Sequence, residues 1–231
     1  MAKENKAVKS KQEPKTILGK PRNSSQSSEF RGPEKNIFSR IWHFLWKEDS
    51  FLSWIVSLAL AFIIVKFIFF PLLSLVFATS LPLVVVESSS MHHPGSFVGN
   101  VMSLQDNFQL WWQEKGSWYT GRGITEQETE NWPLKTGLEI GDIVLVTGHG
   151  KPEIGDIIIF NANQAHPIIH RIVNIENISG QTYYSTKGDN NEGQLISEKE
   201  IPSNALIGKA VLRIPKLGWL KLGFVKLFQA L

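Results

Sequence analysis

The sequence predicts a mainly β domain behind one N-terminal transmembrane helix. Two observations carry this prediction. Between Phe51 and Val86 the only charged residue is Lys66, and a spanning helix needs about 20 mainly apolar residues. Beyond that run, short β-branched and aromatic segments are separated by Gly, Asp, Asn and Pro, which is typical of strands joined by turns.

The first 50 residues are expected to form a basic cytoplasmic tail. They carry 11 Lys or Arg and six Asp or Glu, whereas the rest of the chain carries 13 and 15. Residues 1–35 have few large apolar side chains, which predicts disorder. Residues 36–46 have helical apolar spacing and form either an interfacial helix or an early extension of the span. Under the positive-inside rule, residues 51–78 cross the membrane and residues 79–231 lie on the outer or lumenal face.

The strands of the outer domain are predicted from five apolar runs, at residues 83–86, 143–146, 157–160, 168–173 and 182–186. Two of them open with the same pair, Gly141-Asp142 and Gly155-Asp156. This repetition predicts adjacent strands entered by similar turns.

Two further segments leave alternatives open. Residues 97–139 are rich in Trp, Gln and Glu and are expected to form a partly helical insertion, which caps a cleft, contacts lipid, binds a partner or only elaborates the surface. Residues 214–231 mix apolar residues with three lysines. They either lie on the membrane or form a last strand and a helix packed on the core.

Three residues of the outer domain are of the types that nucleophilic acyl transfer needs. Ser90 ends a Ser run after the first strand, His170 lies within an apolar strand, and Asp189 lies in a Gly-Asp-Asn turn. A serine hydroxyl becomes a good nucleophile when a base takes its proton and an acid orients that base. Each residue alone has a plainer interpretation as a turn former or a core histidine.

The chain resembles type I signal peptidases of the archaeal and endoplasmic-reticulum branch. Five segments match in family order behind the anchor. They are Ser-Ser-Ser-Met at 88–91, the Gly-Asp-hydrophobic box at 141–146, Gly-Asp-Ile-Ile-Ile-Phe at 155–160, His-Arg-Ile-Val at 170–173 and Thr-Lys-Gly-Asp-Asn-Asn at 186–191. The resemblance covers residues 51–215, interrupted by the insertion.

This resemblance implies a membrane-anchored serine endopeptidase that removes signal peptides from secreted preproteins. Ser90 would be the nucleophile, His170 the general base and Asp189 the acid, with Glu192 as the second choice for the acid. The backbone N–H of Ser90 and the hydroxyl of Ser88 would form the oxyanion hole. Its partners would be preproteins, the lipid bilayer and the protein translocation machinery.

The chain departs from the family pattern in three places. Met91 is followed by two residues before Pro94, one more than the family usually has. The acid that the endoplasmic-reticulum branch carries shortly after the Gly-Asp-Asn-Asn turn is replaced in that region by Gln194 and Leu195. The insertion at 97–139 is the third departure.

Other functional classes receive less support. The absence of cysteine excludes thiolate chemistry and disulfides. The excess positive charge belongs to the tail, so we expect no nucleic-acid partner. No zinc-type spacing of histidines and carboxylates appears, and we expect no metal and no other cofactor. The remaining alternative is a catalytically inactive anchored β domain that binds the translocation machinery or exported chains.

Overall fold

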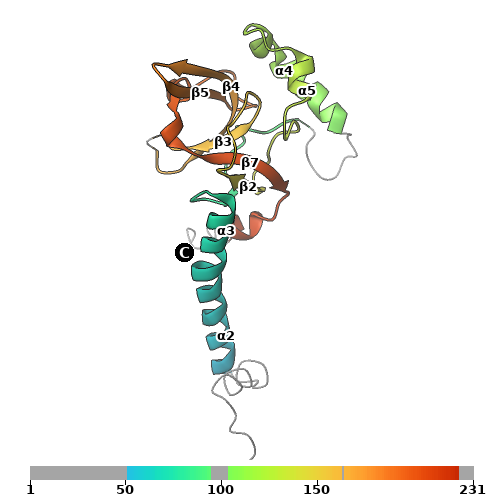
Figure 1. Ribbon diagram of the computed structural model, residues 1–231. Helices are drawn as coiled ribbons and strands as arrows, with labels where there is room; N and C mark the ends of the chain where they lie inside the picture. The colour runs from blue at the N-terminus through green and yellow to red at the C-terminus, as the bar shows by residue number, and fades with distance from the viewer. Residues whose placement is uncertain (1–50, 95–103, 163, 224–231) are drawn as a thin grey trace, which may run out of the picture. The chain divides into compact units, whose positions relative to one another are not determined.

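A computed structural model describes residues 51–94, 104–162 and 164–223 (Figure 1). The predicted tail, residues 1–50, lies outside this part. The chain divides into two units between Val56 and Ser57, and the described residues of the first unit begin helix α2. One helix, Phe51–Phe77, is long and apolar enough to cross a membrane. Its 27 residues span about 40 Å at 1.5 Å per residue, more than the roughly 30 Å of a hydrocarbon core.

This helix consists of three segments and ends in a left-handed residue. The segments are α2 (Phe51–Ile64), the π-helical turn η1 (Val65–Phe69) and α3 (Phe70–Phe77). Ala78 has φ 49°, and the N–H of Thr79 donates to the Ser74 carbonyl at 3.1 Å, which closes the helix as C-terminal caps do. The Thr79 hydroxyl donates to the Ile207 carbonyl at 2.9 Å, so the chain enters the β domain directly after the helix.

The β domain is a seven-stranded antiparallel sheet with the order β1-β2-β7-β3-β4-β5-β6. The sheet is curled (Figure 1). Its strands are β1 (Leu83–Val85), β2 (Ile143–Thr147), β3 (Ile157–Phe160), β4 (Ile168–Ile178), β5 (Gln181–Lys187), β6 (Ile201–Pro202) and β7 (Leu206–Ile214). The five predicted runs correspond to β1 to β5, and the mainly β character is confirmed.

The strands that follow the two Gly-Asp pairs are not adjacent, and that prediction is wrong. Strand β7 returns between β2 and β3 and pairs with both. The turns themselves are alike. Gly141 and Gly155 both have positive φ, 87° and 95°, which glycine adopts without a steric penalty. Asp142 and Asp156 each accept a hydrogen bond from the backbone N–H three residues earlier, at 2.7 and 3.0 Å.

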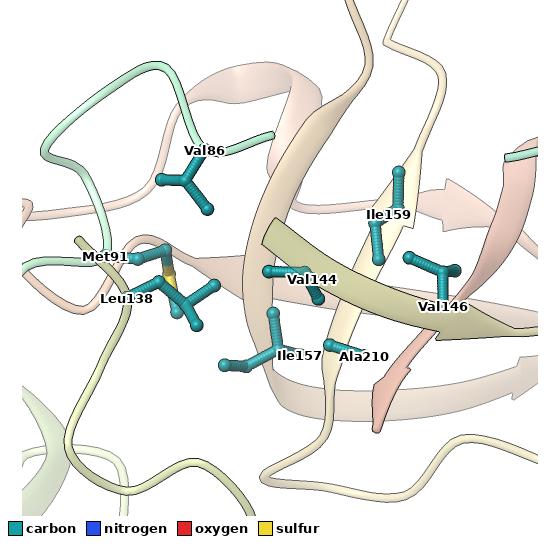
Figure 2. Packing of buried hydrophobic residues seen from close by; sticks show 8 residues of the cluster. All are labelled: Val86, Met91, Leu138, Val144, Val146, Ile157, Ile159 and Ala210. Atoms are coloured by element: carbon teal, nitrogen blue, oxygen red, sulfur yellow. The ribbon is translucent and has the colours of Figure 1, made fainter. Parts of the chain in front are cut away.

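One hydrophobic cluster joins the sheet to the loop that carries Ser90. Figure 2 shows its eight buried members, Val86, Met91, Leu138, Val144, Val146, Ile157, Ile159 and Ala210. Met91 lies beside Leu138 at one end of the cluster. Because Met91 is 1% exposed, the residue after Ser90 is anchored in the core.

The Trp-rich stretch contains two helices, α4 (Leu104–Thr120) and α5 (Glu126–Glu130). Phe108, Trp111 and Tyr119 recur at helical spacing and are buried together with Val173 of β4. Thr125 and Glu128 form a capping box that starts α5. The insertion therefore packs on the sheet as an integral part of the domain.

The described part of the C-terminal segment shows features of both expected arrangements. The Trp219 ring packs on the backbone of Gly141, where an added Cβ would lie 2.4 Å from the indole Cδ1. Leu217 and Leu220 are 49% and 68% exposed. Contact of this segment with a membrane stays a prediction.

Candidate active site

Ser90 lies in a loop held at three points. Its carbonyl accepts a hydrogen bond from the backbone N–H of Asn190 at 2.8 Å, and the Met91 carbonyl accepts one from Leu138 at 2.8 Å. The N–H of His92 donates to the Ser89 carbonyl at 3.0 Å. The Ser90 side chain is half-buried while its backbone is fixed. This combination suits a nucleophile that must meet a substrate at the surface.

His170 is the third residue of β4 and lies opposite Ile158 of β3. It is 4% exposed, and its Nδ1 is hydrogen bonded to the carboxylate of Glu198. An ionised carboxylate can only accept, so Nδ1 carries the proton in the neutral ring. The lone pair of Nε2 is then free to take a proton.

The backbone of Ser90 and the ring of His170 both lie close to Gly188. A Cβ built on Gly188 would lie 2.8 Å from His170 Nε2 and 2.8 Å from the Ser90 carbonyl oxygen. Both distances are shorter than real Cβ contacts allow, so residue 188 must lack a side chain for the two residues to approach. Residues from two distant segments are thus brought to one place by the Gly-Asp-Asn turn.

The hydroxyl of Ser90 is 3.1 Å from that of Ser88. Within the described residues, Ser88 is its hydrogen-bond partner, and the structure shows no hydrogen bond from it to His170. The predicted oxyanion residue Ser88 therefore lies beside the predicted nucleophile.

Asp189 is not placed where the sequence suggested. Its carboxylate is fully buried and accepts from the Arg171 guanidinium, with the shortest distance 2.7 Å from Nη2 to Oδ2. Nε2 of His93 lies 2.9 Å from the same oxygen. Burial alone would raise the pKa of Asp189, but Arg171 and His93 together hold it well below its usual range. The carboxylate bonded to His170 is that of Glu198 instead.

Sequence reasoning missed Glu198. This residue ends the short helical turn η2 (Ile196–Glu198), is fully buried, and accepts the Leu195 backbone N–H at 2.5 Å through Oε2. Glu198 thus follows a few residues after Gln194 and Leu195, the region where the resemblance led us to expect an acid. Little in the local sequence indicates that Glu198 is buried, because the next two residues, Lys199 and Glu200, are also charged.

Glu192, the second choice for the acid, also lies elsewhere. Its carboxylate pairs with the ammonium of Lys115 in α4 and is 89% exposed. This pair lowers the pKa of Glu192. The structure therefore places neither of the two expected acids on His170.

Lys187 is a second buried charge that the sequence reasoning did not single out. Its ammonium donates to the carbonyls of Gly188 and Asp189 at 3.0 and 3.3 Å. It also lies 5.0 Å from the centre of the Tyr119 ring. Burial lowers the pKa of Lys187 to about 8.

The two histidines of the Ser90 loop, His92 and His93, each pair with one carboxylate. Nδ1 of His92 lies 2.6 Å from Glu139, and His93 pairs with Asp189. Burial lowers the pKa of His93, which favours its neutral form. These pairs support the loop, and each histidine uses one ring nitrogen to do so.

No protein-family model matches the chain, and no curated protein matches its sequence. The geometry of the site and the sequence motifs remain as grounds for a functional proposal.

Proposed function

We propose that this protein is a membrane-anchored serine endopeptidase that removes signal peptides from secreted preproteins. The observation that carries the proposal is the convergence at Gly188 of the Ser90 backbone and His170 Nε2, with Glu198 on the opposite nitrogen of the same imidazole. This is the order of groups that activates a serine hydroxyl.

In the proposed reaction, Ser90 Oγ attacks the carbonyl carbon of the scissile peptide bond while His170 Nε2 takes its proton. Glu198 stabilises the imidazolium that forms and keeps the ring in the productive tautomer. The imidazolium then gives its proton to the leaving amine, which leaves an acyl ester on Ser90. A water molecule, deprotonated by His170, hydrolyses this ester and restores the hydroxyl.

The Ser90 hydroxyl must turn from Ser88 toward His170 for the first step. Catalytic hydrogen bonds often tighten only when substrate binds. When Ser90 turns, the Ser88 hydroxyl loses its partner and can donate to the developing oxyanion together with the Ser90 N–H. Each such donor contributes on the order of 3 kcal/mol to transition-state stabilisation.

The anchor has a role in this proposal. The apolar helix ends at Phe77, and only the short strand β1 separates it from the loop of Ser90. The reaction would then take place close to the outer membrane surface, where the cleavage site of a translocated preprotein emerges. Selection of small residues before the cleaved bond, the A-x-A-like pattern, belongs to the same proposal.

The test is cleavage of a preprotein by the purified full-length protein in detergent or lipid. We expect a cut after the signal peptide, and a loss of at least about 10⁴-fold in kcat for Ser90→Ala and for His170→Ala. Undiminished cleavage by Ser90→Ala would contradict the proposal.

A second candidate is the catalytically inactive β domain that binds exported chains or the translocation machinery. The hydrogen bond between the Ser88 and Ser90 hydroxyls favours it, since Ser90 is not directed at His170 in the free protein. Wild-type protein that binds preproteins without cutting them would support this candidate.

A further inference from the structure

One face of helix α4 contacts both loops of the candidate site. Asn107, Trp111, Lys115 and Tyr119 recur every four residues, so they lie in one row along the helix. The first three contact a loop of the site, and Tyr119 contacts the last residue of β5. The amide of Asn107 donates to the Pro94 carbonyl at 2.6 Å, and Lys115 pairs with Glu192. The ring of Tyr119 lies beside the Lys187 ammonium.

Trp111 is the central member of this row. Its ring stacks on His93 with centroids 4.4 Å apart and planes 6° from parallel. Its indole N–H donates to the Asp189 carbonyl at 3.0 Å. Trp111 thus holds the loop after Ser90 with its ring and the Gly-Asp-Asn turn with its N–H. Trp111 is 2% exposed, so both contacts are shielded from water.

These two segments are the ones that set the distance between the reacting groups. The backbone of Asn190 donates to the Ser90 carbonyl, and Gly188 lies between Ser90 and His170 Nε2. A shift of either segment would move the Ser90 hydroxyl relative to its base. A misplacement of about 1 Å can cost about 10²-fold in rate.

We infer that helix α4 positions the candidate site through Trp111, which holds the Ser90 loop against the Gly188–Asp189 turn. This inference rests on the proposed function. Trp111 is a positioning residue, since it contacts His93 and Asp189 and neither Ser90 nor His170.

The kinetic constants of the folded protein distinguish a positioning residue from one that only packs. A residue that only filled the interior would reduce the amount of folded protein and leave kcat per folded molecule unchanged. A positioning residue lowers kcat of the folded protein and changes KM little. The neighbouring Trp112 offers a matched control, because it is on the same helix and in the same aromatic cluster.

The experiment compares Trp111→Leu, Trp111→Phe and Trp112→Leu as full-length proteins cleaving one preprotein. We expect Trp111→Leu to lower kcat by about 30- to 100-fold, as a misplacement of about 1 Å does, with KM changed less than about threefold. Trp111→Phe keeps a stacking ring without the N–H and should recover most of this loss. Trp112→Leu should stay within about threefold of wild type. Equal kcat losses in Trp111→Leu and Trp112→Leu, or a loss confined to KM, would overturn the inference.

A second measurement does not depend on activity. Amide hydrogen exchange reports local opening, and we expect residues 88–93 and 188–191 to exchange at least about tenfold faster in Trp111→Leu than in Trp112→Leu. Equal exchange in the two variants would overturn the positioning role. If wild-type protein cleaves no preprotein but the exchange difference is found, the proposed function fails while the structural coupling holds.

Discussion

The part of the chain that the structure describes contains two buried histidine–carboxylate pairs, His170–Glu198 and His93–Asp189, with opposite properties. His170 uses Nδ1 for its carboxylate and directs Nε2 toward Gly188 and the Ser90 backbone. His93 uses Nε2 for its carboxylate, and within the described residues its Nδ1 has no hydrogen-bond partner.

The carboxylates differ as much as the rings. Asp189 is already neutralised by the Arg171 guanidinium, so little of its charge remains to stabilise an imidazolium. The other partner of Glu198 is the backbone N–H of Leu195. A carboxylate that faces a histidine without an arginine partner suits acid–base chemistry, whereas a carboxylate shared with a buried arginine holds segments together.

Removing the charge of Glu198 is expected to have the largest effect on kcat. Glu198→Gln should lower kcat by about 10³- to 10⁴-fold, because the amide neither fixes the tautomer nor stabilises the imidazolium. The melting temperature should change much less than in variants of Asp189. Steady-state cleavage and thermal unfolding measure the two effects, and near-normal kcat in Glu198→Gln would argue against this residue as the acid.

Substitution of Asp189 should affect the stability of the fold more than it affects kcat. Asp189→Asn leaves the Arg171 charge buried without its partner, which costs about 3–5 kcal/mol of unfolding free energy. Because the pKa of Asp189 is held low in the folded protein, the stabilisation is present above the unfolded pKa and is lost as the pH falls from there toward the folded pKa. Denaturant unfolding at neutral and acidic pH checks both statements. The double variant Asp189→Asn/Arg171→Met should recover part of the loss, and full additivity of the two changes would count against a coupled pair.

Lys187 is a buried cation that lies beside both pairs. Burial lowers its pKa from 10.5 to about 8, so between these values the unfolded chain binds more protons than the folded one, and folding is favoured as the pH rises. Relative to Lys187→Met, wild-type protein should gain about 2–3 kcal/mol of unfolding free energy between about pH 7 and pH 10. Parallel pH profiles of the two proteins would mean that the ammonium is well solvated.

The smallest effect is expected at Glu192. The Glu192 carboxylate is exposed and paired with Lys115, and such pairs contribute about 0–1 kcal/mol. Glu192→Gln should leave kcat within about twofold of wild type and shift the stability by less than about 1 kcal/mol. A kcat loss approaching that of Glu198→Gln would show that the acid had been assigned to the wrong residue.

Much of the fold was predictable because its signals are local. The apolar run and the alternating strand segments report burial residue by residue, and the two Gly-Asp turns form as expected from their sequence. The pairing of β7 between β2 and β3 depends on contacts far apart in the chain, which no local pattern encodes. Strand β7 itself was overlooked, although residues 206–214 contain a run of apolar residues.

The site was predictable to a smaller extent. Ser90 and His170 could be chosen because motifs mark them, and the structure brings their segments together at Gly188. The carboxylate that is bonded to His170 could not be chosen, because Asp189 and Glu198 are both buried acids, and only the fold determines which one faces His170. The insertion showed an every-fourth-residue row from Asn107 to Tyr119 in its sequence, but the loops that this row contacts are visible only in the folded chain.

The state of Ser90 during a single turnover reports directly whether the proposed acyl-enzyme forms. Excess full-length protein is mixed with a preprotein, quenched in acid at successive times and examined by mass spectrometry. The proposed function predicts a transient ester of the signal peptide on the peptide that contains Ser90, absent in Ser90→Ala, which should leave the preprotein intact. Preprotein cut at an equal rate by Ser90→Ala, with no ester on the wild-type protein, would contradict it.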